Sequence, residues 1–468
     1  MSPRILLVAL AACLVATAAG AQQDLAGIGV REQQIEAVNR SEQIMQGAQR
    51  RKGILAQYQV MRRAYATETN PNFHVIFGQY LSWYQTFIGD YPDAIQSFSI
   101  KEQPLADDAP SPLAQPGWHA VLARTYLPTL AKPCKAVFFN EAHNVPVTRS
   151  LTVQLLKVLR EEGFNTFAAE TLYHSDKDLA KRGYPTADSG FYTREPVYAE
   201  MVREALKLGY KVVAYEADDQ YQGDAREAQQ ARNLAKLFKG DPDTKLVVDA
   251  GYAHIQKEGK FLGAQSMAEH FVEDSGISPL AIEQTMLISH DGSTLDHPYY
   301  AAMVQSLGSS QPIVFVNAQG QPWSLRPGYD VSVIFPATQL NDGRPTWLAL
   351  GGLRVPYHFD GTICQNRFPC LIEARYANEG DDAIPADRMV LDLIPLTTVD
   401  DIQVTTSGSY TMPSGSLYLR PGSYRIRVSD ENGSTITQQS IKVSDKTAAV
   451  ANNTGPANTA TPSAQPNP

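Results

Sequence analysis

The clearest pattern in the chain is an alternation of short apolar runs with amphipathic segments between residues 135 and 335. The apolar runs have the length of strands and cover 136–139, 166–169, 212–215, 246–248, 280–282 and 313–316. Between them, apolar side chains return at helical intervals, as at Leu151, Leu155 and Leu159 before Gly163. Strands that alternate with helices in this way form parallel sheets with crossover helices. We therefore predict an α/β domain over residues 131–338, with a mostly parallel sheet flanked by helices.

The regions on either side of this domain have different patterns. Residues 22–130 are expected to be mainly helical and to cap the α/β domain, because residues such as Ile35, Val38 and Met45 recur at helical spacing. From residue 339 to residue 446 the helical period is lost, which predicts a small antiparallel β module. Its β-rich runs, separated by Gly and Pro, are 389–394, 402–405, 416–419 and 424–428. Residues 447–468 contain no charged side chain and are rich in Ala, Thr, Asn and Pro, which is typical of a disordered tail.

The first residues of the chain have the pattern of a secretory signal peptide. Arg4 precedes an uncharged apolar stretch at 5–19, and residues 19–21 (Ala-Gly-Ala) match the small-x-small pattern at which such leaders are cleaved. Residues 1–21 are therefore predicted to be a leader, which implies a secreted or periplasmic protein. A lipid anchor at Cys13 is the competing interpretation, but it would require a very short apolar core. No later segment has the roughly 20 uninterrupted apolar residues of a membrane span.

The composition excludes several classes of protein. With 468 residues, 43% of them hydrophobic and 19% charged, the chain is neither wholly disordered nor fibrous. The formal charge of −9 argues against a general nucleic-acid binder, which normally carries a basic surplus. The chain also lacks a Gly-x-Ser-x-Gly elbow, a P-loop and a dinucleotide-binding fingerprint, which disfavours a standard serine hydrolase, an NTPase and a dinucleotide enzyme.

Three of the four cysteines lie beyond the predicted leader. Cys364 and Cys370 bracket a short loop and are the expected disulfide pair in an oxidising compartment. Cys134 then remains as a lone thiol just before an apolar strand. A buried structural cysteine is more common in that position than a nucleophile.

Polar side chains follow the predicted strands at the points where the strands end. In an open parallel sheet the carboxyl ends of the strands share one edge, and ligands bind there. A single carboxylate after a strand is usually a helix cap or a solvated loop residue. Several histidines and glutamates at corresponding positions have no evident packing purpose, and together they indicate a functional site. The residues concerned are Glu141, His143, Glu170, Glu216, His254 and Glu283.

Around these residues the sequence resembles a known superfamily. The motifs are 140–146 (Asn-Glu-Ala-His-Asn-Val-Pro), the strand that ends in Glu170, 232–235 (Arg-Asn-Leu-Ala), 251–254 (Gly-Tyr-Ala-His) and 267–271 (Met-Ala-Glu-His-Phe). Their order and spacing are similar to those of the superfamily that contains erythromycin esterases, ChaN-like haem-binding uptake proteins and Tiki/TraB proteins. The resemblance covers about 135–290. In these families the first motif normally opens with Gly, where this chain has Asn140, a side chain that could tighten the turn or narrow the pocket.

The esterase branch of this superfamily implies a hydrolase. By resemblance, Glu141 and His143 would activate water, while His254 and Glu170 would orient it or stabilise the tetrahedral intermediate. A neutral His held by a carboxylate is a competent base near neutral pH. Arg232 would position a substrate or a carboxylate. The expected substrate is a small molecule or peptide with an ester or amide bond, and the implied catalytic set is Glu141, His143, Glu170, Glu216, Arg232 and His254.

The other branches imply different chemistry. The Tiki-like branch implies a divalent metal, for which His143, His254 and Glu170 are the candidate ligands, with one position left open for water. Residue type alone does not separate metal-dependent from metal-free hydrolysis. The ChaN-like branch implies a non-catalytic carrier of haem or another ligand, with Tyr173 and His174 among the candidate haem ligands.

Two further features extend this hypothesis. His290 and His297 follow the fifth predicted strand and are candidates for the same sheet edge. The C-terminal β module is a candidate binding site for a partner protein or a glycan.

Overall fold

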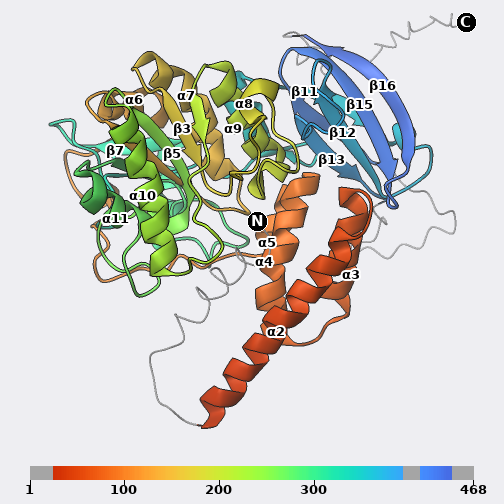
Figure 1. Cartoon of the computed structure of the whole chain (residues 1–468), viewed down its shortest axis with the longest axis horizontal. Helices are drawn as coiled ribbons and strands as arrows, with labels where there is room; N and C mark the ends of the chain where they lie inside the picture. The colour runs from red at the N-terminus through yellow and green to blue at the C-terminus, as the bar shows by residue number, and fades with distance from the viewer. Residues whose placement is uncertain (1–24, 394–411, 445–468) are drawn as a thin grey trace, which may run out of the picture.

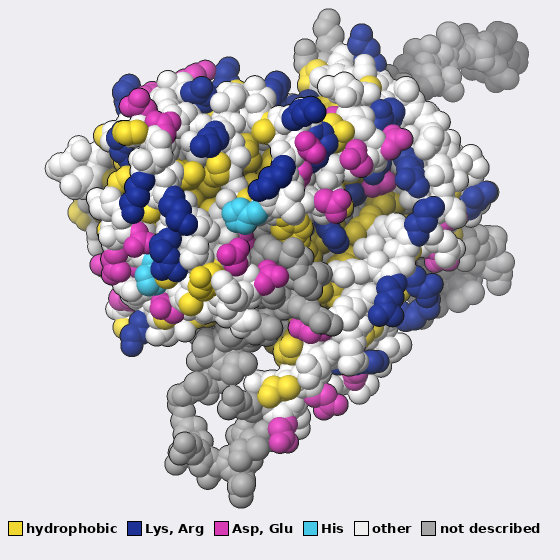
Figure 2. Space-filling model, in the orientation of Figure 1, with side chains coloured by type: hydrophobic (Ala, Val, Ile, Leu, Met, Phe, Trp, Pro, Cys, Tyr) yellow, Lys and Arg dark blue, Asp and Glu magenta, His cyan; other side chains and the backbone are white. Residues whose placement is uncertain are grey.

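The computed structural model describes residues 25–393 and 412–444. The predicted leader, the β-rich run at 402–405 and the predicted tail lie outside the described residues. Figure 1 shows an α/β domain, a group of N-terminal helices that projects from it, and a β module at its side. In the described part of the chain, no helix is both long enough and apolar enough to cross a membrane. Acidic and basic side chains are interspersed over much of the face shown in Figure 2.

The α/β domain is built on a six-stranded parallel sheet. Every residue of its two central strands is buried, because helices cover both faces, and this explains their continuous apolar runs. The predicted α/β fold class, with a mostly parallel sheet flanked by helices, is confirmed. In spatial order the strands are β4 (Lys211–Val213), β3 (Thr166–Ala169), β5 (Leu246–Gly251), β2 (Ala136–Glu141), β6 (Leu280–Glu283) and β8 (Val331–Ser332).

The two faces of the sheet pack against different helices. Phe139 of β2 points into the core formed with α7 (Val147–Glu161) and α9 (Pro196–Lys207), whereas Phe138 points into the opposite core. That opposite core is formed with α10 (Asp224–Gly240) and α11 (Met267–Ser275). The connections contain α6 (Ala123–Ala131), α8 (Leu179–Arg182), α12 (Pro298–Leu307) and the 3₁₀ turns η2 (Tyr192–Arg194) and η3 (Tyr252–Ile255).

One predicted strand lies outside this sheet. The run at 313–316 forms β7 (Ile313–Val316), which pairs antiparallel with β1 (His119–Leu122). The sixth position in the sheet belongs instead to the two-residue β8. β1 lies within the region predicted to be mainly helical, and it is a strand because β7 supplies its hydrogen-bonding partner. Before it, the chain from residue 99 forms loops and the short η1 (Pro112–Ala114).

The N-terminal helices pack around one buried helix. They are α2 (Leu25–Gln49), α3 (Ile54–Thr67), α4 (Pro71–Ile88) and α5 (Tyr91–Ser97) (Figure 1). The Asn70 side chain caps the start of α4, and Gly89, with a φ of 83°, ends it. Trp83 of α4 meets Tyr192 of the α/β domain edge to face. Ile35, whose spacing helped to predict α2, is 53% exposed and does not belong to its buried face.

The C-terminal module consists of antiparallel sheets around a separate core. The Cys364–Cys370 disulfide is present, as expected from the sequence. Arg388 of the module donates hydrogen bonds to the backbone oxygen atoms of Phe87 (2.9 Å) and Arg194 (2.8 Å), so it joins the module to both other parts. The strands are β11 (Val355–Asp360) with β14 (Ser414–Leu419), and β13 (Asp387–Leu391), β12 (Cys370–Tyr376), β15 (Gly422–Asp430) and β16 (Thr435–Val443) in order. The connecting segment contains β9 (Leu340–Asn341), β10 (Arg344–Pro345), η4 (Thr346–Gly352) and η5 (Gly361–Cys364).

Candidate active site

Most of the residues expected at the strand ends lie together at the carboxyl edge of β2, β3 and β5. Within this strand-end cluster, His143 is 3% exposed, Glu170 3% and His254 9%. Glu141 and Glu216 are also buried. Buried carboxylates and imidazoles need partners, and each is held by a specific hydrogen bond. The complete cluster is Glu141, His143, Arg149, Glu170, Glu216, Arg226, Glu227 and His254.

The first unit of the cluster is a pair formed by His143 and Glu141. Nδ1 of His143 lies 2.7 Å from Oε1 of Glu141, and both residues come from the end of β2. Arg149 of α7 donates to Oε2 of Glu141 from Nε at 3.2 Å and also from Nη2, and it reaches the backbone oxygen of His143 at 3.1 Å. Tyr192 stacks on the imidazole with a centroid distance of 4.1 Å. The ring of His143 is therefore held by Glu141 and Tyr192, and its backbone by Arg149.

The charges around Glu141 keep it ionised. Burial raises the pKa of this carboxyl group, but Arg149 and His143 outweigh burial and lower it below its usual value. An ionised Glu141 accepts the proton on Nδ1 of His143. When the ring is neutral, that tautomer leaves the lone pair on Nε2.

The second unit is centred on Glu170 at the end of β3. One of its oxygens accepts from the backbone N–H of Gly251 at 2.6 Å, and the other accepts from Nη2 of Arg226 at 3.0 Å. Nε2 of His254 lies 3.7 Å from the oxygen that Arg226 contacts. Burial raises the pKa of Glu170, but the charges of His254, His143 and Arg226 and the Gly251 amide together lower it to about 2. Glu170 is therefore a carboxylate throughout the physiological range.

Arg226 links this carboxylate to Glu216. Its Nη2 and Nε atoms lie 2.8 Å and 3.0 Å from the two oxygens of Glu216, which also accepts from Gln230 at 2.8 Å. Burial alone lowers the pKa of Arg226, but Glu216 and Glu170 raise it well above its usual value. A permanent positive charge thus sits between two buried carboxylates.

His254 is held by a carboxylate of its own. Its Nδ1 lies 2.6 Å from Oε2 of Glu227, which also accepts from the backbone N–H of Met267 at 3.0 Å. Burial lowers the pKa of His254, but Glu227 and Glu170 raise it above its usual value. The surroundings therefore favour an imidazolium at this position.

The structure places Arg232 away from this cluster. Its side chain is exposed on α10 and donates to Gln229 of the same helix at 3.0 Å. Arg226, about one and two-thirds turns earlier, contacts Glu170 and so has the carboxylate-positioning role that the resemblance assigned to Arg232. Sequence reasoning also missed Arg149 and Glu227. The sequence pattern could have indicated these residues. They are Arg149, Arg226 and Glu227, and they lie in the first turns of helices that follow the predicted strands.

Gly251 and Tyr252 shape the space between the two units. A Cβ atom on Gly251 would collide with the ring of His143 and would lie 3.1 Å from Oε2 of Glu170. Only glycine allows both side chains to approach β5 so closely. Tyr252 follows with a φ of 43°, a left-handed conformation that is uncommon for a bulky residue, and its ring meets His143 edge-on at 5.1 Å.

Asn140 and Glu283 have supporting roles at this edge. Oδ1 of Asn140 accepts from the backbone N–H of Gln284 at 2.6 Å, and its Nδ2 donates to the backbone oxygen of Tyr252 at 2.9 Å. Asn140 therefore ties the ends of β2, β5 and β6 together. Glu283 accepts from the backbone N–H of Met286 at 2.9 Å and from the hydroxyl of Thr285 at 2.8 Å, so it anchors the loop after β6.

The geometry of the cluster does not fit the predicted metal site. A metal held by His143, His254 and Glu170 would require these side chains to turn free donor atoms to one point. Both oxygens of Glu170 already accept hydrogen bonds from N–H groups. One of these donors is the cationic Arg226, which already supplies the positive charge that a metal would bring. Among the described residues, no group of three or more His, Cys, Asp or Glu side chains is arranged to hold a metal ion.

The remaining candidates lie around this cluster. His174 is exposed, and its Nε2 lies 2.9 Å from the backbone oxygen of Glu216. Tyr173 is half-buried beside it. His290 pairs with Asp296 at 3.0 Å, and His297 caps α12 and contacts Asp108 at 3.1 Å. Neither His290 nor His297 contacts the strand-end cluster.

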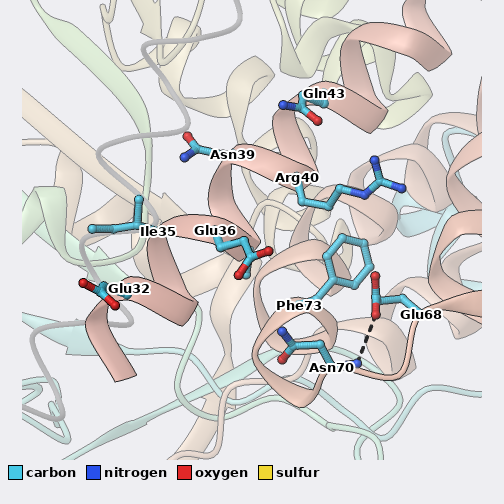
Figure 3. A pocket seen from close by; sticks show the side chains of 10 residues that line it. Glu32, Ile35, Glu36, Asn39, Arg40, Gln43, Glu68, Asn70 and Phe73 are labelled. Atoms are coloured by element: carbon cyan, nitrogen blue, oxygen red, sulfur yellow. Dashed lines mark hydrogen bonds between the residues drawn. The ribbon is translucent and has the colours of Figure 1, made fainter. Parts of the chain in front are cut away.

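Figure 3 shows a hollow that is separate from the strand-end cluster. It has a volume of about 480 Å³ and is lined by side chains of α2 together with Glu68, Asn70 and Phe73. None of these residues belongs to the strand-end cluster. The hollow therefore has no part in the chemistry of that cluster.

Comparisons with known proteins find distant structural likeness only. No family model and no curated protein matches the chain. The type III effector HopBA1 is 16% identical, with a TM-score of 0.25 over 39% of this chain and 96% of that one. The RRSP effector domain of a MARTX toxin from Vibrio vulnificus CMCP6 is 14% identical, with a TM-score of 0.26 over 52% of this chain and 56% of that one. At these TM-scores the likeness carries no argument about function.

Proposed function

We propose that the protein hydrolyses an ester or amide bond with water that His143 activates. The observation that carries this proposal is the buried 2.7 Å bond between His143 Nδ1 and Glu141, which Arg149 holds in place. Nε2 of His143 takes a proton from water while the resulting hydroxide attacks the carbonyl carbon. Glu141 stabilises the imidazolium that forms, as an orienting carboxylate does in other hydrolytic sites.

His254 is the proposed acid of the same reaction. The raised pKa of His254, caused by Glu227 and Glu170 against the effect of burial, supports a proton at this position. When the tetrahedral intermediate collapses, its bond to the leaving oxygen or nitrogen breaks, and Nε2 of His254 donates the proton that this atom needs. The products are a carboxylic acid and an alcohol or amine; the proton taken up by His143 is released to solvent, and His254 regains a proton from solvent. Glu227 holds His254 in position through the 2.6 Å bond to Nδ1.

A panel of nitrophenyl esters and peptide amides tests this proposal on the purified protein. We expect His143→Ala and Glu141→Gln to lower kcat/KM by about 10²–10⁴-fold, the usual contribution of a positioned general base. Arg232→Ala is the matched control, because its side chain is exposed and distant from the strand-end cluster. Full activity of both Glu141→Gln and His254→Ala on an identified substrate would overturn the proposal.

An absorbance spectrum distinguishes the rival function, a haem or ligand carrier, from the proposed hydrolase. Stoichiometric haem gives a Soret band, and elemental analysis of the same sample reports any bound metal. A carrier without hydrolytic activity would retain its ligand in the His143→Ala variant.

We further propose that the protein acts outside the cytoplasm. The predicted leader and the Cys364–Cys370 disulfide support this location, because disulfides persist in oxidising compartments. N-terminal sequencing of the exported protein should begin at Gln22.

A further inference from the structure

The side chain of Tyr192 ends in a buried hydroxyl group. The residue begins η2, just before α9, and is 1% exposed. Among the residues that the structure describes, none makes a hydrogen bond with its Oη atom. Most buried hydroxyl groups in native proteins have a partner, and a catalytic role is one of the few reasons for an exception. The hydroxyl group of Tyr192 is therefore available to a reactant.

The ring of Tyr192 lies against the proposed catalytic base. It stacks on the imidazole of His143 with a centroid distance of 4.1 Å and an angle of 22° between the ring planes. The rings of Trp83 and Phe191 meet Tyr192 edge to face, with centroid distances of 6.1 Å and 5.4 Å. These contacts hold the phenol ring beside His143 before any substrate binds.

The hydroxyl group lies on the Nε2 side of this imidazole. Nδ1 of His143 faces Glu141, whereas Nε2 faces Gly251 and Glu170. A Cβ atom on Gly251 would lie 2.4 Å from Nε2 and 3.1 Å from Oε2 of Glu170. Burial raises the pKa of the Tyr192 hydroxyl well above its usual value, and Glu170 raises it more than Glu141 does. Because both carboxylates are buried, the larger effect marks the nearer one, which is Glu170.

Nε2 of His143, Oε2 of Glu170 and Oη of Tyr192 can together complete the hydrogen bonds of one water molecule. The water donates one proton to Nε2 and the other to Oε2, because a carboxylate oxygen accepts more than one hydrogen bond. The hydroxyl group of Tyr192 donates to one lone pair of the water oxygen, and the second lone pair stays free for attack. A neutral donor such as water fits this place better than an oxyanion does, since Glu170 and Glu141 disfavour a further negative charge there.

We propose that the hydroxyl group of Tyr192 donates a hydrogen bond to the water that His143 activates, which makes Tyr192 a catalytic residue. As one O–H bond of the water breaks and its proton passes to Nε2, the water oxygen forms the bond to the carbonyl carbon, and Tyr192 keeps its own proton. This inference rests on the proposed hydrolytic function of His143. It adds that a nucleophile other than water depends less on Tyr192.

Tyr192→Phe tests this role, because it keeps the ring and removes only the hydroxyl group. We expect kcat for a nitrophenyl ester to fall about 10²-fold, as it does when a reactant is misplaced, while KM changes by less than about twofold. The urea midpoint of unfolding should stay the same or rise, since no hydrogen bond within the described structure is lost. Tyr80→Phe is the matched control. Its hydroxyl group is also buried without a described partner, but it belongs to α4 and lies outside the strand-end cluster.

Tyr215→Phe separates a direct action on water from an indirect action through Glu170. The hydroxyl group of Tyr215 is likewise buried with no partner in the described part of the chain, and Glu170 raises its pKa. However, Tyr215 packs in the core on the opposite face of the sheet from Tyr192. We expect full activity in this variant. Equal losses of kcat in Tyr192→Phe and Tyr215→Phe would overturn the direct role of Tyr192.

Hydroxylamine provides a readout that a structural role of Tyr192 would not change. Its nitrogen attacks the ester carbonyl in place of water, nitrophenol leaves, and the product is a hydroxamic acid. After subtraction of the uncatalysed reaction, the ratio of hydroxamic acid to carboxylic acid should rise at least about tenfold in Tyr192→Phe relative to the wild type and Tyr80→Phe. An unchanged ratio would overturn this inference and leave the proposed function of His143 intact. A wild type that hydrolyses no ester or amide would overturn that function, and the role of Tyr192 with it.

Discussion

The hydroxyl group of Tyr91 donates a hydrogen bond to Oε1 of Glu195 at 2.9 Å, and both side chains are buried. Oε2 of Glu195 lies 2.9 Å from Nη1 of Arg149, the arginine that holds Glu141. Glu195 also caps α9 by accepting from the backbone N–H groups of Val197 and Tyr198, both at 2.8 Å. A helix of the N-terminal region is therefore connected through two side chains to the carboxylate that orients His143.

Tyr91→Phe tests this connection. We expect a loss of about 1 kcal/mol in the free energy of unfolding, because Glu195 keeps its charge but loses one buried donor. Activity should fall several-fold as Arg149 and Glu141 lose part of their support. Urea denaturation and kcat/KM on the same sample measure both effects. An unchanged unfolding midpoint would show that the Tyr91 hydroxyl does not support Glu195.

Arg226→Met should be among the most damaging changes in the protein. It leaves Glu170 and Glu216 buried without their shared cation, which we expect to cost about 3–5 kcal/mol. Arg232→Met, on the same helix but exposed, should change stability by less than about 0.5 kcal/mol. Chemical denaturation of the two variants compares them directly. Equal stabilities would contradict the assignment of Arg226 to the strand-end cluster.

Gly251→Ala should impair the site more than the fold. The new methyl group would press against His143 and lie close to Glu170, so the two units of the cluster must separate by a few tenths of an ångström or more. We expect kcat/KM to fall by at least about tenfold, since catalysis is sensitive to small misplacements. Gly240→Ala, where a Cβ meets nothing within 4 Å, is the control. Full activity in Gly251→Ala would indicate that His143 need not stay beside Glu170.

The stability of the protein should depend on pH through His254. Burial lowers the pKa of its imidazole, but Glu227 and Glu170 raise it by more, so the net pKa lies above the usual value. The folded protein therefore holds this proton more tightly than the unfolded chain. The resulting stabilisation is complete below the unfolded pKa of about 6.5 and is lost as pH rises through the folded pKa. His254→Gln should remove this part of the pH dependence. Thermal unfolding from pH 5 to pH 9 measures it, and identical curves for wild type and variant would contradict the raised pKa.

The sheet and most of the site could be predicted because their signals are local. A buried parallel strand needs a continuous apolar run, and a polar residue at its end falls on a shared edge whatever the rest of the chain does. The pairing of 313–316 with β1 could not be predicted in this way. Four apolar residues have the same pattern in a parallel sheet and in an antiparallel ribbon.

The arginines of the site were harder to identify from sequence. A lone Arg on an amphipathic helix is normally a surface residue, and Arg149 has this appearance although it is buried. The choice of Arg232 followed a short motif and ignored helix geometry. Six residues turn an α-helix by about 600°, so Arg232 points away from the side that Arg226 presents, whereas Gln230 shares that side after about 400°. The structure agrees, since Gln230 and Arg226 both contact Glu216.

The bonds that Arg388 makes to the backbone of Phe87 and Arg194 have a consequence for how the molecule melts. A β module attached by a tether would show a calorimetric peak of its own. The Arg388 guanidinium also pairs with Glu373 of the module at 2.8 Å, and it is buried against the N-terminal helices and the α/β domain at once. Separation of the module would therefore leave two carbonyl oxygens and one Nη atom of the buried guanidinium without these partners. The three parts are therefore expected to absorb heat in a single cooperative transition, with the module behaving as a fixed part of the molecule rather than as an appendage.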